Sequence, residues 1–223
     1  MSADPQGCRR DRVAGPLPQG GGNRSPGTNP ERRENREPNQ RKVPVSDGVE
    51  PSAPRPLCQA DVAEQLEITC ADLGAVETGE AVLELVDGYA REPMTGMGAP
   101  LGRAARERLI PALRDHPTTR VLLAWHHQMP VGLAISFVGF STFEARPLLN
   151  LHDLFVRADY RGMGIGRALL SEVEILARRL GCCRVTLEVR KDNRRALGLY
   201  SSFGFSGSPD QEDRSTLFLT KML

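Results

Sequence analysis

The chain has no apolar run long enough to cross a bilayer, and its N-terminus has no apolar segment of the kind that secretory signals require. These absences argue against a membrane-spanning or secreted protein, so we predict no membrane partner and a cytoplasmic location. Acidic residues near the start, among them Asp4 and Asp11, also argue against an organellar transit peptide.

A strong net charge and a metal-binding cysteine spacing are also missing. The formal charge is +1, so no strong field draws the protein to nucleic acid. The five cysteines contain no Cys-x-x-Cys pair. His126 and His127 are adjacent and would point to opposite faces of a strand. We therefore expect neither a bound metal nor a nucleic-acid partner.

Apolar residues are scarce in the first 60 residues, where Gly, Pro, Asn, Arg and Ser predominate. Such a segment cannot bury enough surface to offset the entropy that ordering it would cost. Its mixed charges argue against a nucleic-acid-binding arm. We predict a disordered N-terminal extension over residues 1–60 and one folded domain over residues 61–223.

Hydrophobic periodicity in the remainder predicts an order of strand, two helices, three strands, helix, strand, helix and strand. The expected strands are residues 66–70, 120–125, 131–143, 148–156, 184–190 and 215–223. The expected helices are residues 82–89, 102–116, 166–180 and 193–203, with a mobile loop at 91–102. A strand–helix–strand unit requires one parallel pair, whereas the short connections require antiparallel pairs. The predicted fold class is α/β, with a mixed, mostly antiparallel sheet of six to seven strands and helices on both faces.

Residues 149–170, LNLHDLFVRADYRGMGIGRALL, combine an apolar strand, a glycine-rich loop and the start of a helix. Glycines without a Cβ let several backbone N–H groups approach one anion, and the N-terminus of the helix adds partial positive charge. Arg161 and Arg167 flank the loop and would add charge-assisted contacts. This stretch predicts a site for a pyrophosphate or a phosphopantetheine arm.

A dinucleotide-binding loop is the alternative interpretation. That motif places its first glycine directly after the strand and an acidic residue near the end of the next strand. Here residues 157–161 separate the strand from Gly162, and Glu188 is followed by Val189 and Arg190 and so falls inside a strand. The spacing therefore favours a site for a pyrophosphate or a phosphopantetheine arm over a dinucleotide-binding loop.

The element order and the run Arg161-Gly162-Met163-Gly164-Ile165-Gly166 together resemble the GNAT superfamily of acyl-CoA-dependent N-acyltransferases. Further along, Glu188, Asn193 and Tyr200 recur at the spacing of the family's fifth strand and fourth helix. This spacing is similar to that of ribosomal-protein alanine acetyltransferases, and residues 143–165 are similar to diamine and polyamine acetyltransferases. The resemblance covers roughly residues 64–223.

The resemblance implies acetyl-CoA as the acyl donor. The backbone of residues 154–156 would pair with the pantetheine arm as an added strand would, and residues 161–167 would hold the pyrophosphate. Asn193 would contact the cofactor, although it would equally serve as the N-cap of the last helix. The residues implied in cofactor binding are Leu154, Phe155, Val156, Arg161, Gly162, Met163, Gly164, Ile165, Gly166, Arg167 and Asn193.

Two catalytic residues follow from the same resemblance. Tyr200 would protonate the CoA thiolate, although a tyrosine at helical spacing is also a common core residue. Glu188 would act as the base, directly or through water; alternatively it is an exposed strand residue paired with Arg184 or Arg190.

The identity of the base stays open between Glu188, His152 and a water chain. Diamine acetyltransferases carry a glutamate where this chain has His152. Because His152 and Asp153 are successive, they face opposite sides of a strand unless a bulge intervenes.

We therefore predict an acetyl-CoA-dependent N-acetyltransferase in which a primary amine attacks the donor directly. The expected acceptor is a small amine or an amino-acid-like molecule. The alternatives are a protein N-terminal or lysine acetyltransferase and a noncatalytic acyl-CoA-binding module. A homodimer is compatible with all three.

Overall fold

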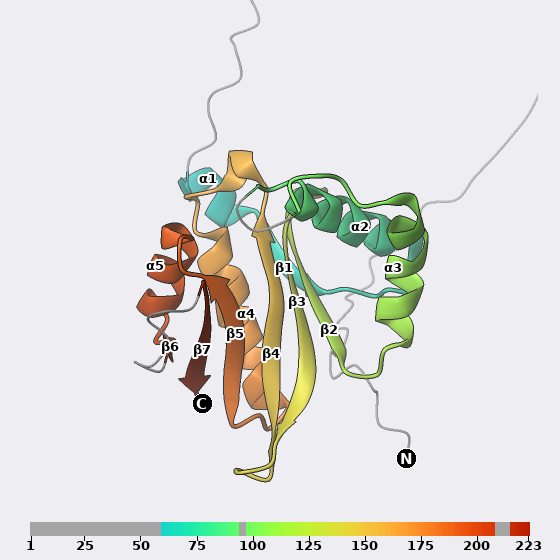
Figure 1. The fold of residues 1–223 in the computed structure, drawn as a ribbon. Helices are drawn as coiled ribbons and strands as arrows, with labels where there is room; N and C mark the ends of the chain where they lie inside the picture. Colours follow the sequence, from blue (N-terminus) through green and yellow to red (C-terminus); the bar gives the residue numbers. More distant parts are fainter. Residues whose placement is uncertain (1–58, 94–96, 208–214) are drawn as a thin grey trace, which may run out of the picture. The chain divides into compact units, whose positions relative to one another are not determined.

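A computed structural model describes residues 59–93, 97–207 and 215–223 (Figure 1). The predicted disordered extension lies outside the described residues except at its end, because the first helix, α1, runs over Gln59–Glu64. The sequence pattern missed this short helix and placed the first element at Leu66. Val62 explains its presence, since this side chain is fully buried in the core.

Seven strands form one sheet in the order β1-β2-β3-β4-β5-β7-β6. Every neighbouring pair is antiparallel except β4 and β5, which run parallel. The prediction of a mixed, mostly antiparallel sheet is confirmed, and β6 is the one described strand that it did not include. The bounds are β1 Leu66–Cys70, β2 Thr119–His126, β3 Met129–Ser141, β4 Arg146–Val156, β5 Arg184–Arg190, β6 Ser206–Gly207 and β7 Thr216–Met222.

Helices cover both faces of this sheet, as the sequence predicts. In Figure 1, α4 passes behind the strands, whereas α2 and α3 lie to the right. Apolar side chains of α4 and α5 pack with one face of the strands, and those of α2 and α3 pack with the other. The bounds are α2 Val76–Ala90, α3 Arg103–Asp115, the 3₁₀ helix η1 Ala158–Tyr160, α4 Ile165–Arg179 and α5 Arg194–Ser202.

The parallel pair separates partway along its length. β4 and β5 are in register only from Leu149 opposite Val185 to Leu151 opposite Leu187. Beyond this point β4 continues to Val156 and stays paired with β3 on its other side. Among the described residues, no strand pairs with the β5-facing edge of residues 152–156. This edge therefore offers backbone N–H and C=O groups to an extended ligand.

A β-bulge interrupts β4 at His152. Ile135 of β3 is opposite Asp153 and Ser136 is opposite Leu151, which leaves His152 as an extra residue. Before the bulge, Leu149 and Leu151 pack on the α4 side, whereas after it Phe155 packs on the side of α2 and α3. The bulge thus reverses the alternation of side chains along β4.

Asp87 connects α2 to the segment that precedes α3. Its Oδ1 accepts a hydrogen bond of 2.9 Å from the backbone N–H of Leu101, and its carboxylate pairs with Arg91 and Arg106, each at 2.9 Å. The Asp87 side chain is only 11% exposed. This carboxylate therefore holds the described part of the predicted loop close to the C-terminal end of α2.

We expect Asp87→Ala to lower the free energy of unfolding by about 2–3 kcal/mol at neutral pH, because two guanidinium groups and one N–H lose their shared acceptor. Burial alone would raise the pKa of Asp87, but Leu101, Arg91 and Arg106 together hold it below its usual value. A carboxyl with a depressed pKa in the folded state stabilises the protein above its unfolded pKa of about 3.9. This contribution is lost as the pH falls through the folded pKa.

Urea unfolding of the wild type and the variant at neutral and acidic pH measures this effect. The difference between the two proteins should shrink in acid. Asp115→Ala, which removes an exposed ion pair with Arg114, is the control and should change stability by less than about 1 kcal/mol. If Asp87→Ala lowered the free energy of unfolding equally at both pH values, the proposed role of the Asp87 charge would be contradicted.

Candidate active site

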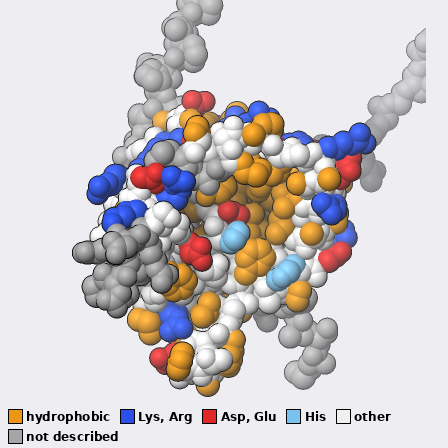
Figure 2. Space-filling view, in the orientation of Figure 1, with side chains coloured by type: hydrophobic (Ala, Val, Ile, Leu, Met, Phe, Trp, Pro, Cys, Tyr) orange, Lys and Arg blue, Asp and Glu red, His pale blue; other side chains and the backbone are white. Residues whose placement is uncertain are grey.

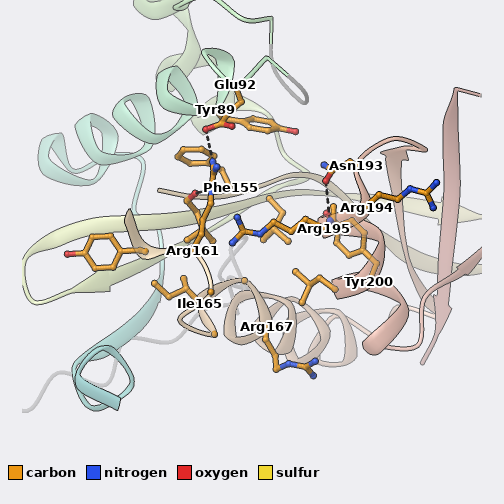
Figure 3. A pocket seen from close by; sticks show the side chains of 18 of the residues that line it. Tyr89, Glu92, Phe155, Arg161, Ile165, Arg167, Asn193, Arg194, Arg195 and Tyr200 are labelled. Carbon is orange, nitrogen blue, oxygen red and sulfur yellow. Dashed lines mark hydrogen bonds and ion pairs between the residues drawn. The ribbon is translucent and has the colours of Figure 1, made fainter. Parts of the chain in front are cut away.

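A cavity of about 540 Å³ lies where β4 has separated from β5 (Figure 3). The end of β4, the glycine loop and the first residues of α4 and α5 line it. Every residue predicted to bind the cofactor reaches this cavity except Met163, which packs against the core beside α4. Tyr200 also lines it, whereas Glu188 does not.

The glycine loop has the backbone conformation that its sequence predicts. Gly162 and Gly164 have φ angles of +82° and +86°, in the left-handed region that side chains disfavour. Gly164 is the N-cap of α4, whose first backbone bond runs from the Ala168 N–H to the Gly164 carbonyl. The N–H groups of the preceding residues have no partner within the helix and are available to an anion at the cavity wall.

The N-terminus of α5 forms a second wall of the same cavity. The Asn193 side chain accepts a hydrogen bond of 3.1 Å from the Ala196 N–H, so the predicted N-cap is confirmed. Asn193 also lines the cavity. Two helix N-termini therefore contribute partial positive charge to one space.

Arginine side chains surround this space. Arg161, predicted as a phosphate ligand, donates to the Val156 carbonyl at 3.0 Å and pairs with Glu92 at 2.6 Å. Arg167 donates to the Ser202 hydroxyl at 2.8 Å. Both predicted arginines thus lie at the site, each with a partner from the protein.

The sequence interpretation missed Arg194 and Arg195, which also line the cavity. Within the part of the chain that the structure describes, neither guanidinium has a hydrogen bond or an ion pair. Cations in the first turn of a helix oppose its dipole, so two successive arginines directly after an N-cap could have indicated an anion site. Like Arg167, whose partner is a neutral hydroxyl, these arginines have no acidic partner among the described residues and leave positive charge beside the cavity.

Tyr200 is buried, with 7% of its surface exposed. Its ring packs edge-on against Phe205, with the ring centres 5.8 Å apart. Burial, reinforced by the charges of Tyr89 and Asp153, raises the pKa of Tyr200 well above its usual value. The hydroxyl therefore remains protonated at neutral pH and is suited to act as a proton donor.

Glu188 is exposed on β5, outside the cavity. The predicted alternative, an exposed strand residue paired with Arg184 or Arg190, is confirmed for the exposure and wrong for the pairing. Arg184 donates to the Ser141 hydroxyl, and Arg190 pairs with Asp192 at 2.6 Å. The face of the sheet that carries Glu188 is the one toward α2 and α3, because Thr186, two residues earlier, bonds to Asn150 on the side away from α4.

Figure 2 shows a hollow on this side of the molecule, lined by hydrophobic side chains, with carboxylate and histidine side chains inside it. His152 is exposed, and its ring is 5.7 Å from the ring of Phe137, which packs with α2 and α3. Asp153 is half-buried, and its charge acts on Tyr200. The question that the sequence left open is answered: a bulge does intervene, and His152 and Asp153 share one face.

The fold and the site define a class of protein: an α/β protein with a separated parallel strand pair and a cavity beside a glycine loop at a helix N-terminus. The model of the acetyltransferase (GNAT) family matches residues 84–205, more than half of the chain. The chain belongs to this family. The sequence-based prediction of the family and its fold is confirmed.

Individual relatives match parts of the chain. Thialysine N-epsilon-acetyltransferase of Bos taurus is 35% identical over 74 residues, which is 33% of this chain and 43% of that protein. The chain thus matches less than half the length of this relative. A solved NatC complex bound to Gag peptide and CoA is 18% identical, with a TM-score of 0.54 over 71% of this chain and 99% of that chain. A ribosomal-protein-alanine N-acetyltransferase from Brucella melitensis biovar Abortus 2308 is 17% identical, with a TM-score of 0.50 over 62% of this chain and 90% of that one.

Two further observations concern metal binding and membrane-spanning helices. Among the described residues, no group of three or more His, Cys, Asp or Glu side chains is arranged to hold a metal ion. Within the same residues, no helix is both long enough and apolar enough to cross a membrane.

Proposed function

We propose that this chain is an acetyl-CoA-dependent N-acetyltransferase that transfers the acetyl group to a primary amine. The observation that supports this proposal best is the free edge of β4 at residues 152–156, whose residues 154–156 line one cavity together with the glycine loop and Tyr200. An extended arm pairs with a free strand edge through backbone hydrogen bonds. A pyrophosphate suits the N–H groups at the start of a helix.

The cavity fits such a cofactor residue by residue. Leu154, Phe155 and Val156 would bond to the arm through their backbone, and residues 161–167 would bond to the pyrophosphate. Arg194 and Arg195, which have no partner among the described residues, would hold the remaining phosphate charge. When bound, acetyl-CoA supplies the activated acetyl group. The chain would position this group beside an amine, take a proton from the amine and give one to the departing thiolate.

Tyr200 is the proposed general acid. Its raised pKa keeps the proton on the hydroxyl at neutral pH, so that this proton is available to the thiolate as the thiolate departs. The backbone N–H groups near the end of β4 would polarise the carbonyl under attack. Glu188 and His152 are both candidates for the base that neutralises the amine, and both lie on the face that carries the hollow.

The acceptor that we propose is a small amine or an amino-acid-like molecule. The similarity to thialysine N-epsilon-acetyltransferase, an enzyme named for an amino-acid substrate, supports this class. The hollow of Figure 2, with carboxylates beside apolar side chains, suits an amine that arrives as a cation. A protein N-terminus or lysine is the alternative acceptor, because the hollow opens at the surface and would admit a chain end.

A thiol-release assay with acetyl-CoA and a panel of primary amines tests this proposal. The panel should contain amino acids, diamines and peptides with free N-termini, and product masses should identify the acetylated nitrogen. Acetylation of a small amine at a rate well above that of peptides is the expected result. Binding of CoA without thiol release from any amine would instead favour the noncatalytic acyl-CoA-binding module. A cytoplasmic location and a homodimer stay predictions that fractionation and light scattering would test.

A further inference from the structure

The bulge in β4 places two titratable side chains on one face at the point where β4 leaves β5. His152 has no partner on β3, and Asp153 is opposite Ile135. In a regular strand, Asp153 would face α4 and His152 would face away from it. The inserted residue turns both toward the side of α2 and α3.

Asp153 is the more enclosed of the two. Its carboxylate is half-buried, and no hydrogen bond or ion pair is present for it among the described residues. The titratable groups that act on it are His152 beside it on β4 and Tyr200 on α5, which is in turn influenced by Tyr89 on α2. The proposed acid, Tyr200, therefore lies near a carboxylate that has no fixed partner.

His152 is more exposed to solvent than this carboxylate. Its side chain is exposed, and its ring contacts Phe137, which also contacts the ring of His116 at the end of α3. Glu188 on β5 shares this face, just beyond the last register pair of β4 and β5. The imidazole is thus open to water, and its charge acts on Asp153.

We propose that Asp153 is the base that takes a proton from the acceptor ammonium, and that His152 is a positioning residue that passes this proton to solvent. The proposal rests on the proposed function and names the base that the function leaves open. Asp153 is favoured over Glu188 because Asp153 is half-buried and its charge acts on Tyr200, whereas Glu188 is exposed. Burial also raises the pKa of Asp153, and the charge of His152 opposes that rise, so the carboxylate is a better proton acceptor than an ordinary aspartate.

The protons balance in this scheme. The ammonium gives one proton to the Asp153 carboxylate, His152 takes that proton and releases it to water, and the carboxylate is restored. The neutral amine then forms the C–N bond as the C–S bond breaks, and Tyr200 protonates the departing sulfur. The second amine proton, lost as the amide forms, restores the Tyr200 hydroxyl. The net reaction releases one proton to solvent.

Kinetics over a pH range with Asp153→Asn, His152→Ala and Glu188→Gln test the proposal. Asp153→Asn should lower kcat/KM by about 100-fold with an amine that is an ammonium at the assay pH, as loss of a general base does. An amine of low pKa, which arrives neutral, should recover most of that loss. CoA affinity should stay at the wild-type value, which shows that the variant is folded.

His152→Ala should move the acid limb of the kcat/KM profile to higher pH, because the cation that lowers the pKa of Asp153 is gone. It should also lower the rate by about tenfold, and added imidazole should restore part of that rate. His116→Ala, which removes the other histidine from Phe137, is the matched control and should leave the acid limb in place.

A titration that needs no turnover completes the test. Carbon-13 NMR of the Asp153 carboxyl in the free protein should show a raised pKa that rises further in His152→Ala and not in His116→Ala. If Asp153→Asn kept the wild-type pH profile of kcat/KM and Glu188→Gln lost kcat/KM instead, the inference would be overturned. The acetyltransferase proposal would remain intact. A wild type that acetylates no amine would overturn the acetyltransferase proposal itself.

Discussion

Tyr200→Phe should lower the turnover of acetyl-CoA with a primary amine by about 10²–10⁴-fold, the usual contribution of a positioned general acid. The substitution removes one hydroxyl and keeps the ring that packs against Phe205, so the core and the cavity wall should remain. Because the pKa of Tyr200 is raised, the hydroxyl is protonated across the accessible pH range and the loss should appear at every pH. Steady-state kinetics together with calorimetric titration of CoA would measure both parts of this expectation.

Tyr160→Phe provides the comparison for this experiment. Tyr160 is also buried beside the cavity, but its hydroxyl lies 3.3 Å from Nδ1 of His126 and donates to the sulfur of Met129. Removing that hydroxyl should lower stability by about 1 kcal/mol and affect turnover far less than Tyr200→Phe does. Unchanged turnover in Tyr200→Phe at all pH values would remove Tyr200 from the mechanism and leave it a core residue.

Gly164→Val should weaken CoA binding by at least about 100-fold. A β-branched residue at a φ of +86° is strained by about 1–2 kcal/mol, and this strain falls on the N-cap of α4. The valine methyl groups would also block the approach of an anion to the backbone N–H groups of the loop. Isothermal titration with CoA would report the change directly.

Two comparisons isolate the pyrophosphate contact in this experiment. Gly198→Ala, in α5, places a Cβ where no atom lies within 4 Å and should stabilise the helix by about 0.5–1 kcal/mol without affecting CoA binding. An acetylated pantetheine without the nucleotide should bind the wild type and Gly164→Val equally. If the variant lost affinity for this short probe as well, the loop would be shaping the arm site and not the pyrophosphate site.

Local patterns determined much of this fold before any tertiary contact was known. The alternation of residues 184–190 predicted β5 with its bounds, and the apolar stripe of residues 166–180 predicted α4 within a residue at each end. These elements follow from side-chain periods of 2 and 3.6, which a single sequence displays. The same holds for the glycine loop, since a positive φ at Gly162 and Gly164 is a property that the residue type itself favours.

The elements that the sequence missed are short. α1 contains six residues and β6 only two, too few to show a period. α1 is ordered by burial of Val62 against the sheet, and β6 by its pairing with β7. Both depend on partners that lie far away along the chain.

The motif from residue 149 to residue 170, with Asn193 and Tyr200, was enough to predict the family, which is confirmed, and most of the residues that line the cavity. The spacing of these residues was sufficient for that prediction, because they lie in one loop and two helices whose local geometry is regular. The tertiary structure alone decided which side chains share the open face of β4. The bulge at His152, the separation of β4 from β5 and the pairing of Arg161 with Glu92 each depend on register or packing between distant segments. A one-residue insertion in a strand moves every later side chain to the opposite face of the sheet. Such an insertion is identified only from the pairing with the neighbouring strand.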